Sequence, residues 1–159
     1  AAVRELFEEA GIHFFVQQHN QPAIVDATGL SARLAQKRAE LQQGKYDLAT
    51  LMAAERLYCD VGRLSYFFHR VTPEHYPVRF DTHFYLAALP HGQNPLHSSE
   101  EVAESLWVAP KAALDRGQAG NFPMMPPTIA VLRTLAAHDS WNSLCKAFQL
   151  CDPYAAVPN

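Results

Sequence analysis

The feature that most constrains this chain is a run of nine residues near its start, Arg4 to Ile12, which reads RELFEEAGI. The run fits the pattern R-E-U-x-E-E-x-G-U, where U is a bulky aliphatic residue. Gly11 stands where a helix would end in a left-handed cap. A helix is predicted because apolar residues recur at the i, i+3, i+4, i+7 spacing of a buried stripe, at Val3, Leu6, Phe7 and Ala10.

The same helix carries three carboxylates on another face, because residues three and four apart are helix neighbours. These are Glu5, Glu8 and Glu9, and a divalent cation such as Mg2+, which prefers oxygen ligands, would relieve their mutual repulsion. The alternative is an ordinary amphipathic helix with a solvated acidic face and an Arg4–Glu8 ion pair. The match at every specified position favours a functional helix over this alternative.

The nine-residue pattern is the second half of the Nudix box, and the chain therefore resembles the Nudix hydrolases. The complete box also has a glycine and another glutamate before the arginine, and strands normally precede it. Neither the two residues nor the strands lie within this sequence. We expect the chain to be the C-terminal portion of a longer protein.

Composition limits the class of protein. A length of 159 residues, with 48% apolar and 18% charged residues, is typical of one globular domain, which we place at 1–159. A net charge of −3 without a basic cluster gives no electrostatic case for nucleic acid, and no apolar run has the length of a membrane span. Three cysteines without zinc spacing favour reduced thiols and a cytoplasmic location.

Apolar periodicity, turn residues and caps predict the remaining elements. The predicted strands are 12–16, 64–71, 80–89 and 106–109, and the apolar second half of 80–89 suits a strand covered on both faces. The predicted helices are 29–44 with Ser31 as a candidate N-cap, 47–58 capped by Asp47, 110–117, 128–137, and one from Asp139 or Ser140 to Leu150. The two helices in about 29–58 exceed a minimal fold, and this insert would either shape a pocket or interface or serve packing only.

The middle of the chain resembles one Nudix subfamily in particular, that of the mammalian peroxisomal coenzyme A diphosphatase and its bacterial relatives. The resemblance extends to about His138. It rests on the segments HRVTP at 69–73, RFDT at 79–82, EVAES at 101–105 and PPT at 126–128.

This resemblance implies an α/β fold, the Nudix α/β/α sandwich, and a reaction in which water attacks a diphosphate linkage with Mg2+ or Mn2+ as cofactor. Glu8 and Glu9 match the metal-ligating pair. Glu5 matches the position that orients or deprotonates water in some members and adds to metal binding in others. Arg4 matches the arginine that holds these glutamates by ion pairing. Mobile loops of this fold often add a carboxylate, and we choose Glu101, for which a solvated loop charge is an equal alternative.

Several questions stay open at this point. The substrate implied first is coenzyme A or an acyl-coenzyme A; ADP-ribose, NADH or another dinucleotide are rivals, and a non-catalytic Nudix-fold binding module is a second class. A homodimer is expected from the family only.

Individual residues of the predicted strands have structural interpretations. For Arg79 and Asp81, a salt bridge within the sheet is favoured over contact with a nucleotide. Strand core is the default for Tyr66, Phe67 and Phe68, and no histidines form a metal-spaced pair, so His69, His83, His91 and His97 are interpreted as ordinary residues.

Overall fold

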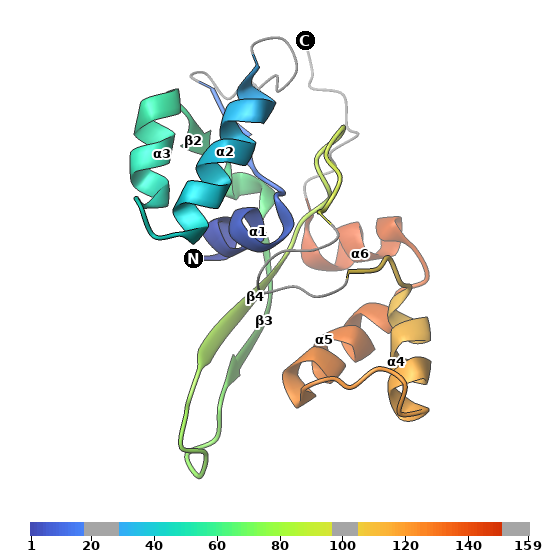
Figure 1. Cartoon of the computed structure of the whole chain (residues 1–159). Coiled ribbons are helices and arrows are strands. Elements are labelled where there is room, and N and C mark those ends of the chain that lie inside the picture. Colours follow the sequence, from blue (N-terminus) through green and yellow to red (C-terminus); the bar gives the residue numbers. More distant parts are fainter. Residues whose placement is uncertain (18–28, 97–104, 151–159) are drawn as a thin grey trace. The chain divides into compact units, whose positions relative to one another are not determined.

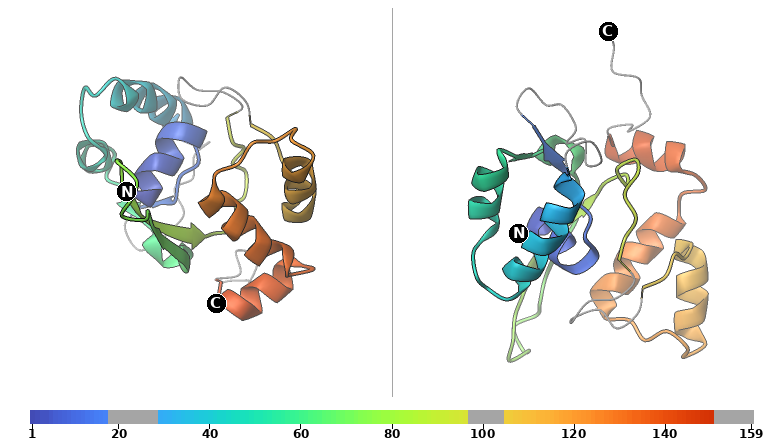
Figure 2. Two further views of the ribbon diagram at one scale, coloured as in Figure 1. Left: turned by 90° about the horizontal axis from the view of Figure 1, so that it is seen from below. Right: turned by 45° about the horizontal axis from the view of Figure 1, so that its top comes forward.

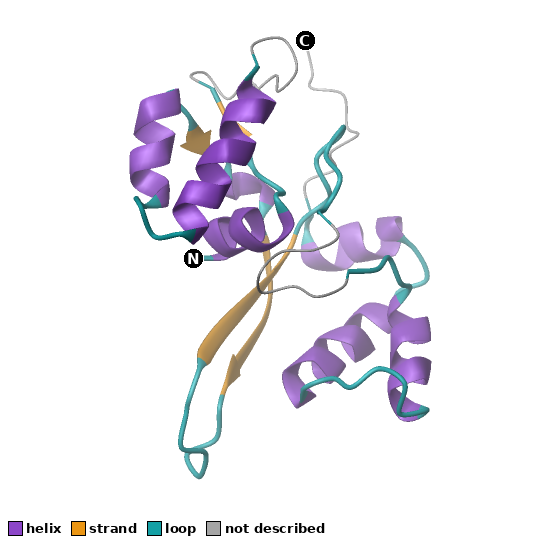
Figure 3. Cartoon of the chain, viewed as in Figure 1, coloured by secondary structure: helices purple, strands orange, loops and turns teal. Residues whose placement is uncertain are grey.

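The computed structural model describes residues 1–17, 29–96 and 105–150. The chain divides into two compact units, one made of residues 1–63 and 89–105 and the other of residues 64–88 and 106–159. Figure 1 labels their helices and, where there is room, their strands, and Figure 3 colours them by type. None of the described helices combines the length and the apolar character needed to cross a membrane.

The first unit is built around a helix followed by a short strand. Helix α1 spans Ala2–Ala10 and strand β1 spans Phe15–Val16, which pairs antiparallel with β2, Tyr58–Cys59. Between the strands lie α2, Leu30–Gln42, and α3, Leu48–Glu55; α2 packs beside α1 (Figures 1 and 2). A 3-10 turn, Val61–Arg63, follows β2. The core consists of apolar side chains from α1, β1, α2, α3 and the segments next to them, among them Phe7, Ile12, Phe14, Phe15, Leu34, Leu41, Leu51 and Leu57.

The second unit combines a two-stranded hairpin with three helices. Strands β3, Ser65–Val71, and β4, Asp81–Leu86, pair antiparallel, with His69 opposite His83. Helix α4 spans Pro110–Gln118 and packs against α5, Pro126–Ala136, and the two lie side by side in Figures 1 and 2. Helix α6, Trp141–Phe148, packs against β3, where the rings of Phe67 and Phe148 meet edge to face at 4.8 Å.

Most predicted helices are present, and their boundaries show which local signals act. Asp47 caps α3 by accepting from the Thr50 amide, and Ser140 caps α6 by accepting from the Ser143 amide, as predicted. Ser31 is not a cap, because α2 already begins at Leu30 after Gly29. Helix α3 ends at Glu55, before the predicted residue 58. Helices α2 and α3 lie within the predicted insert, while the single-domain boundaries stay a prediction.

Three strand predictions need correction. Residues 106–109 form no strand, and Trp107 is 74% exposed, so an apolar run here reflects neither pairing nor burial. Strand β4 is not covered on both faces; exposed and half-buried residues alternate along it, because it belongs to a two-stranded hairpin. The first strand is restricted to Phe15–Val16, although the apolar run that predicted it is buried from Ile12 onward.

The segment after α1 is held in place by the side chain of Gln93, which pairs with the backbone of His13 as a neighbouring strand would. The Gln93 amide accepts a hydrogen bond from the His13 N–H at 2.9 Å and donates to the His13 carbonyl at 2.9 Å. Leu96 N–H donates to the carbonyl of Ala10 at 2.9 Å. The His13 imidazole is buried, stacked on Phe15 at 4.9 Å. Its burial lowers the pKa of His13 to about 4.

We expect this buried imidazole to make the protein less stable in mild acid. In the unfolded chain His13 takes up a proton as the pH falls through about 6.5, whereas the folded protein keeps it neutral down to about pH 4. Between these two pH values the unfolded state therefore binds more protons than the folded state. As the pH falls from about 6.5 to about 4, the free energy of unfolding decreases by about 3 kcal/mol. Urea unfolding of wild type and His13→Phe across this range measures the difference. An equally steep decline in the variant would assign the acid sensitivity to other groups.

Candidate active site on the first helix

Helix α1 buries one face and presents its carboxylates on another. Val3 and Phe7 are buried, and Phe7 packs against Phe15 with ring centroids 5.2 Å apart. The helix ends as predicted, with Gly11 in the left-handed conformation at φ 70° and its N–H donating to the Phe7 carbonyl. A Cβ at Gly11 would lie 3.0 Å from the Leu96 side chain. Both the dihedral angle and the close approach therefore require glycine.

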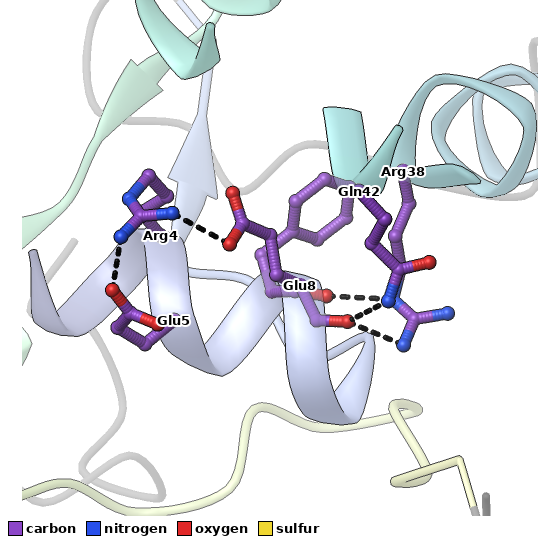
Figure 4. A network of polar contacts seen from close by, with 6 residues as sticks. Arg4, Glu5, Glu8, Arg38 and Gln42 are labelled. Atoms are coloured by element: carbon purple, nitrogen blue, oxygen red, sulfur yellow. Dashed lines mark hydrogen bonds and ion pairs between the residues drawn. The ribbon is translucent and has the colours of Figure 1, made fainter. Parts of the chain in front are cut away.

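Arg4 connects two of the three carboxylates of α1 (Figure 4). Its Nη1 lies 2.6 Å from Glu8 Oε2, and its Nη2 contacts Glu5 Oε1. The hydrogen bond to Glu8, strengthened by the charges of both glutamates, raises the pKa of Arg4. One guanidinium thus orients two carboxylates and offsets part of their repulsion. Both a metal-binding helix and a solvated amphipathic helix would contain the Arg4–Glu8 ion pair, so this contact does not distinguish the two interpretations.

Glu9 is the carboxylate left available. Its side chain is exposed, and within residues 1–17, 29–96 and 105–150 no hydrogen bond or ion pair involves its carboxylate oxygens. Among the described residues, the carboxylate of Glu9 thus has no partner, whereas that of Glu8 is bound by Arg4. Carboxylate oxygens are the ligands that Mg2+ and Mn2+ prefer, so these residues fit such an ion.

Two residues of α2 hold the C-terminal end of α1, and they were not identified from the sequence. Arg38 donates from Nε to the Phe7 carbonyl at 2.8 Å and from Nη2 to the carbonyls of Glu8 at 2.5 Å and Glu9 at 3.1 Å. Gln42 donates to the same Glu8 carbonyl at 2.6 Å (Figure 4). The Phe7 carbonyl also accepts from the Gly11 N–H, whereas the carbonyls of Glu8 and Glu9 have no backbone donor among the described residues. A cation is favoured at this end of the helix dipole.

The placement of Arg38 had a weak signal in the sequence. It lies on the side of α2 that carries Leu34 and Leu41, both buried, so an arginine there must find polar partners inside the unit. Burial lowers the pKa of Arg38. The sequence shows that the arginine faces inward, but not that its partners are the carbonyls of α1.

Glu101 lies outside the described residues, so its selection as a further carboxylate stays a prediction. The described residues on either side are Leu96 and Ser105, and the Ser105 hydroxyl donates to the Leu96 carbonyl at 3.3 Å. Leu96 is itself bonded to Ala10, the last residue of α1.

The hairpin residues have different surroundings from those expected. Phe67 is buried in the strand core as predicted, but Tyr66 is 56% exposed. Arg79 donates to the Thr72 carbonyl at 3.1 Å, whereas Asp81 contacts His69 at 2.5 Å and His83 at 3.5 Å. Within the described residues Asp81 therefore meets two histidines rather than Arg79.

Comparison with known proteins decides what kind of helix α1 is. The sequence model of the NUDT19 Nudix domain matches residues 1–135 of the chain. The chain belongs to the NUDT19 Nudix domain family. The half-box of α1 is therefore a Nudix helix, and the predicted membership of the Nudix superfamily is confirmed.

Two similar Nudix proteins show how much of such a protein this chain covers. A Caenorhabditis elegans protein named "Putative nudix hydrolase 7" is 30% identical over 161 residues, which cover 99% of this chain and 48% of the relative. The crystal structure of a Nudix hydrolase from Alicyclobacillus acidocaldarius superposes with a TM-score of 0.76 at 29% identity, covering 91% of this chain and 63% of that one. The α/β Nudix fold is thus confirmed, and the chain spans about half the length of the curated relative. The roles of Arg4, Glu5, Glu8 and Glu9 stay predictions.

Proposed function

We propose that this Nudix protein hydrolyses a diphosphate linkage in a nucleoside diphosphate derivative, with coenzyme A or an acyl-coenzyme A as the first candidate substrate. The observation that carries the proposal is the state of the three carboxylates in an intact half-box. Arg4 anchors Glu5 and Glu8, and Glu9 is exposed beside them without a partner among the described residues.

Glu8 and Glu9, with a contribution from Glu5, would hold Mg2+ or Mn2+. When bound, such an ion supplies positive charge for the diphosphate oxygens and makes water more acidic. Glu5 would orient the attacking water or accept its proton, while the phosphorus–oxygen bond to the leaving phosphate breaks. Arg4 keeps the carboxylates in position, and Arg38 and Gln42 fix the helix end that bears Glu8 and Glu9.

The choice of coenzyme A rests on the resemblance of the RFDT and EVAES segments, at 79–82 and 101–105, to the coenzyme A diphosphatase subfamily. The products would be adenosine 3′,5′-bisphosphate and a phosphopantetheine. An ADP-ribose or NADH-type pyrophosphatase, or a non-catalytic binding module, are the alternatives. The intact half-box favours an enzyme, because a binding module has no need of all three helix glutamates.

The test is hydrolysis of coenzyme A, with ADP-ribose and NADH in parallel, in the presence of Mg2+ or Mn2+. We expect phosphopantetheine to be released from coenzyme A, as measured by chromatography, and no product without the metal. Cleavage of ADP-ribose or NADH alone would retain the reaction class and reject coenzyme A. If all three substrates stay intact, the enzyme proposal gives way to the binding module.

We also propose a homodimer, because Nudix enzymes are commonly dimers, and a cytoplasmic location, because the three cysteines favour reduced thiols. Light scattering during size-exclusion chromatography tests the first, and imaging of the tagged full-length protein tests the second.

A further inference from the structure

The outer face of the β3–β4 hairpin brings together three side chains that bind metals in other proteins. His69 lies directly opposite His83 in the strand register. Asp81 precedes His83 by two residues on β4, so both point to the same face of the sheet. All three are exposed. Their separation in sequence hides this arrangement, because the two histidines belong to different strands.

The ligand atoms of these residues converge. His69 Nε2 lies 2.5 Å from Asp81 Oδ1, and His83 Nε2 lies 3.5 Å from the same oxygen. One nitrogen or oxygen of each residue lies within 4.8 Å of the others. Donor atoms around a tetrahedral zinc ion at about 2.0 Å are about 3.3 Å apart. A small opening of the His69–Asp81 contact therefore makes room for an ion.

A surface ion pair does not explain the whole arrangement, since one imidazole is enough to pair with one carboxylate. Here the second ring stacks on the first, with centroids 4.3 Å apart and an interplanar angle of 19°. Two ring nitrogens and one carboxylate oxygen therefore converge on the same point, which is the arrangement of a chelating set.

We propose that His69, Asp81 and His83 bind a divalent ion of the zinc type, separately from the carboxylates of α1. Two imidazoles and one carboxylate suit Zn2+ or Co2+ and do not suit Mg2+, which prefers oxygen ligands. Three protein ligands leave a position open to water or an anion. The ion would also link β3 to β4, which matters because a two-stranded hairpin has little stability of its own. This site does not depend on the proposed reaction.

The test uses Co2+ and Zn2+ alone as probes, added to the full chain carrying Glu9→Gln to weaken binding at α1. Titration calorimetry and the visible absorption of Co2+ report binding. We expect His83→Gln and Asp81→Asn, each added to this background, to weaken Zn2+ binding by more than about 10-fold. His75→Gln changes an exposed histidine of the same hairpin outside the cluster, and it should leave binding unchanged. Equal Zn2+ affinity in His83→Gln and His75→Gln would overturn the proposal.

A second measurement avoids the variants and so does not depend on how they fold. Zn2+ added to the wild-type chain should shift the imidazole NMR signals of His69 and His83 and leave those of His75 and His91 in place. Shifts confined to other histidines, or no shifts at Zn2+ concentrations that saturate the calorimetric signal, would also overturn it.

Discussion

Glu9→Gln is expected to lower the turnover of the proposed diphosphate substrate by more than about 100-fold. Loss of groups that only support a metal ligand already costs 10- to 100-fold, and Glu9 is proposed as a ligand itself. The change removes a charge and keeps the shape. Because the Glu9 carboxylate has no partner in the described residues, the free energy of unfolding should stay within about 0.5 kcal/mol of wild type. Steady-state kinetics at several Mg2+ concentrations, with urea unfolding alongside, measure both quantities.

The matched control for Glu9→Gln is Glu74→Gln, the same substitution at an exposed glutamate outside α1. It should keep full activity and full stability. Comparable turnover in the two variants would remove Glu9 from the metal site. A loss of activity in Glu9→Gln accompanied by a clear loss of stability would instead point to a structural role. Glu101→Gln, measured in the same series, tests whether that residue adds a further carboxylate.

Arg38→Met is expected to lower the free energy of unfolding by about 3 kcal/mol. The guanidinium donates to three successive carbonyls, Phe7 to Glu9, but from two nitrogens only, Nε and Nη2. At about 1.5 kcal/mol for each charged donor, the expected loss is about 3 kcal/mol. Methionine fills similar space but leaves the Glu9 carbonyl without a donor among the described residues, while the Phe7 and Glu8 carbonyls keep Gly11 and Gln42. Affinity for Mg2+ should fall as well, by about 10-fold, because the helix end that carries Glu8 and Glu9 loses its support.

The control for Arg38→Met is Arg33→Met on the same helix, where the arginine forms an ion pair with Glu55 at 3.1 Å near the surface. Such a pair contributes about 1 kcal/mol at most. Urea unfolding with unchanged m-values compares the two. A cost for Arg38→Met no greater than that for Arg33→Met would show that the carbonyls of α1 are satisfied by Gln42 and water instead.

The local features of the site were readable from the sequence because they depend on short-range spacing. Residues 3–12 predicted α1, an apolar stripe of which Val3 and Phe7 are buried, and the left-handed cap at Gly11, since helical periodicity and the freedom of glycine act over one or two turns. The same run predicted the Nudix superfamily, and the resemblance of the later segments implied the α/β class; the comparisons confirm both. Asp47 and Ser140 as caps were predictable for the same reason.

The contacts between distant segments were decided only by the tertiary structure. Arg38 reaches the carbonyls of α1 across about thirty residues of chain, Gln93 pairs with the backbone of His13, and His69 meets His83 across a hairpin. The absence of a strand at 106–109 has the same origin, because an apolar extended run becomes a strand only where a partner is present. Periodicity determines which face a residue takes; which other segment meets that face depends on packing of the whole unit, and a single sequence does not encode it at a fixed spacing.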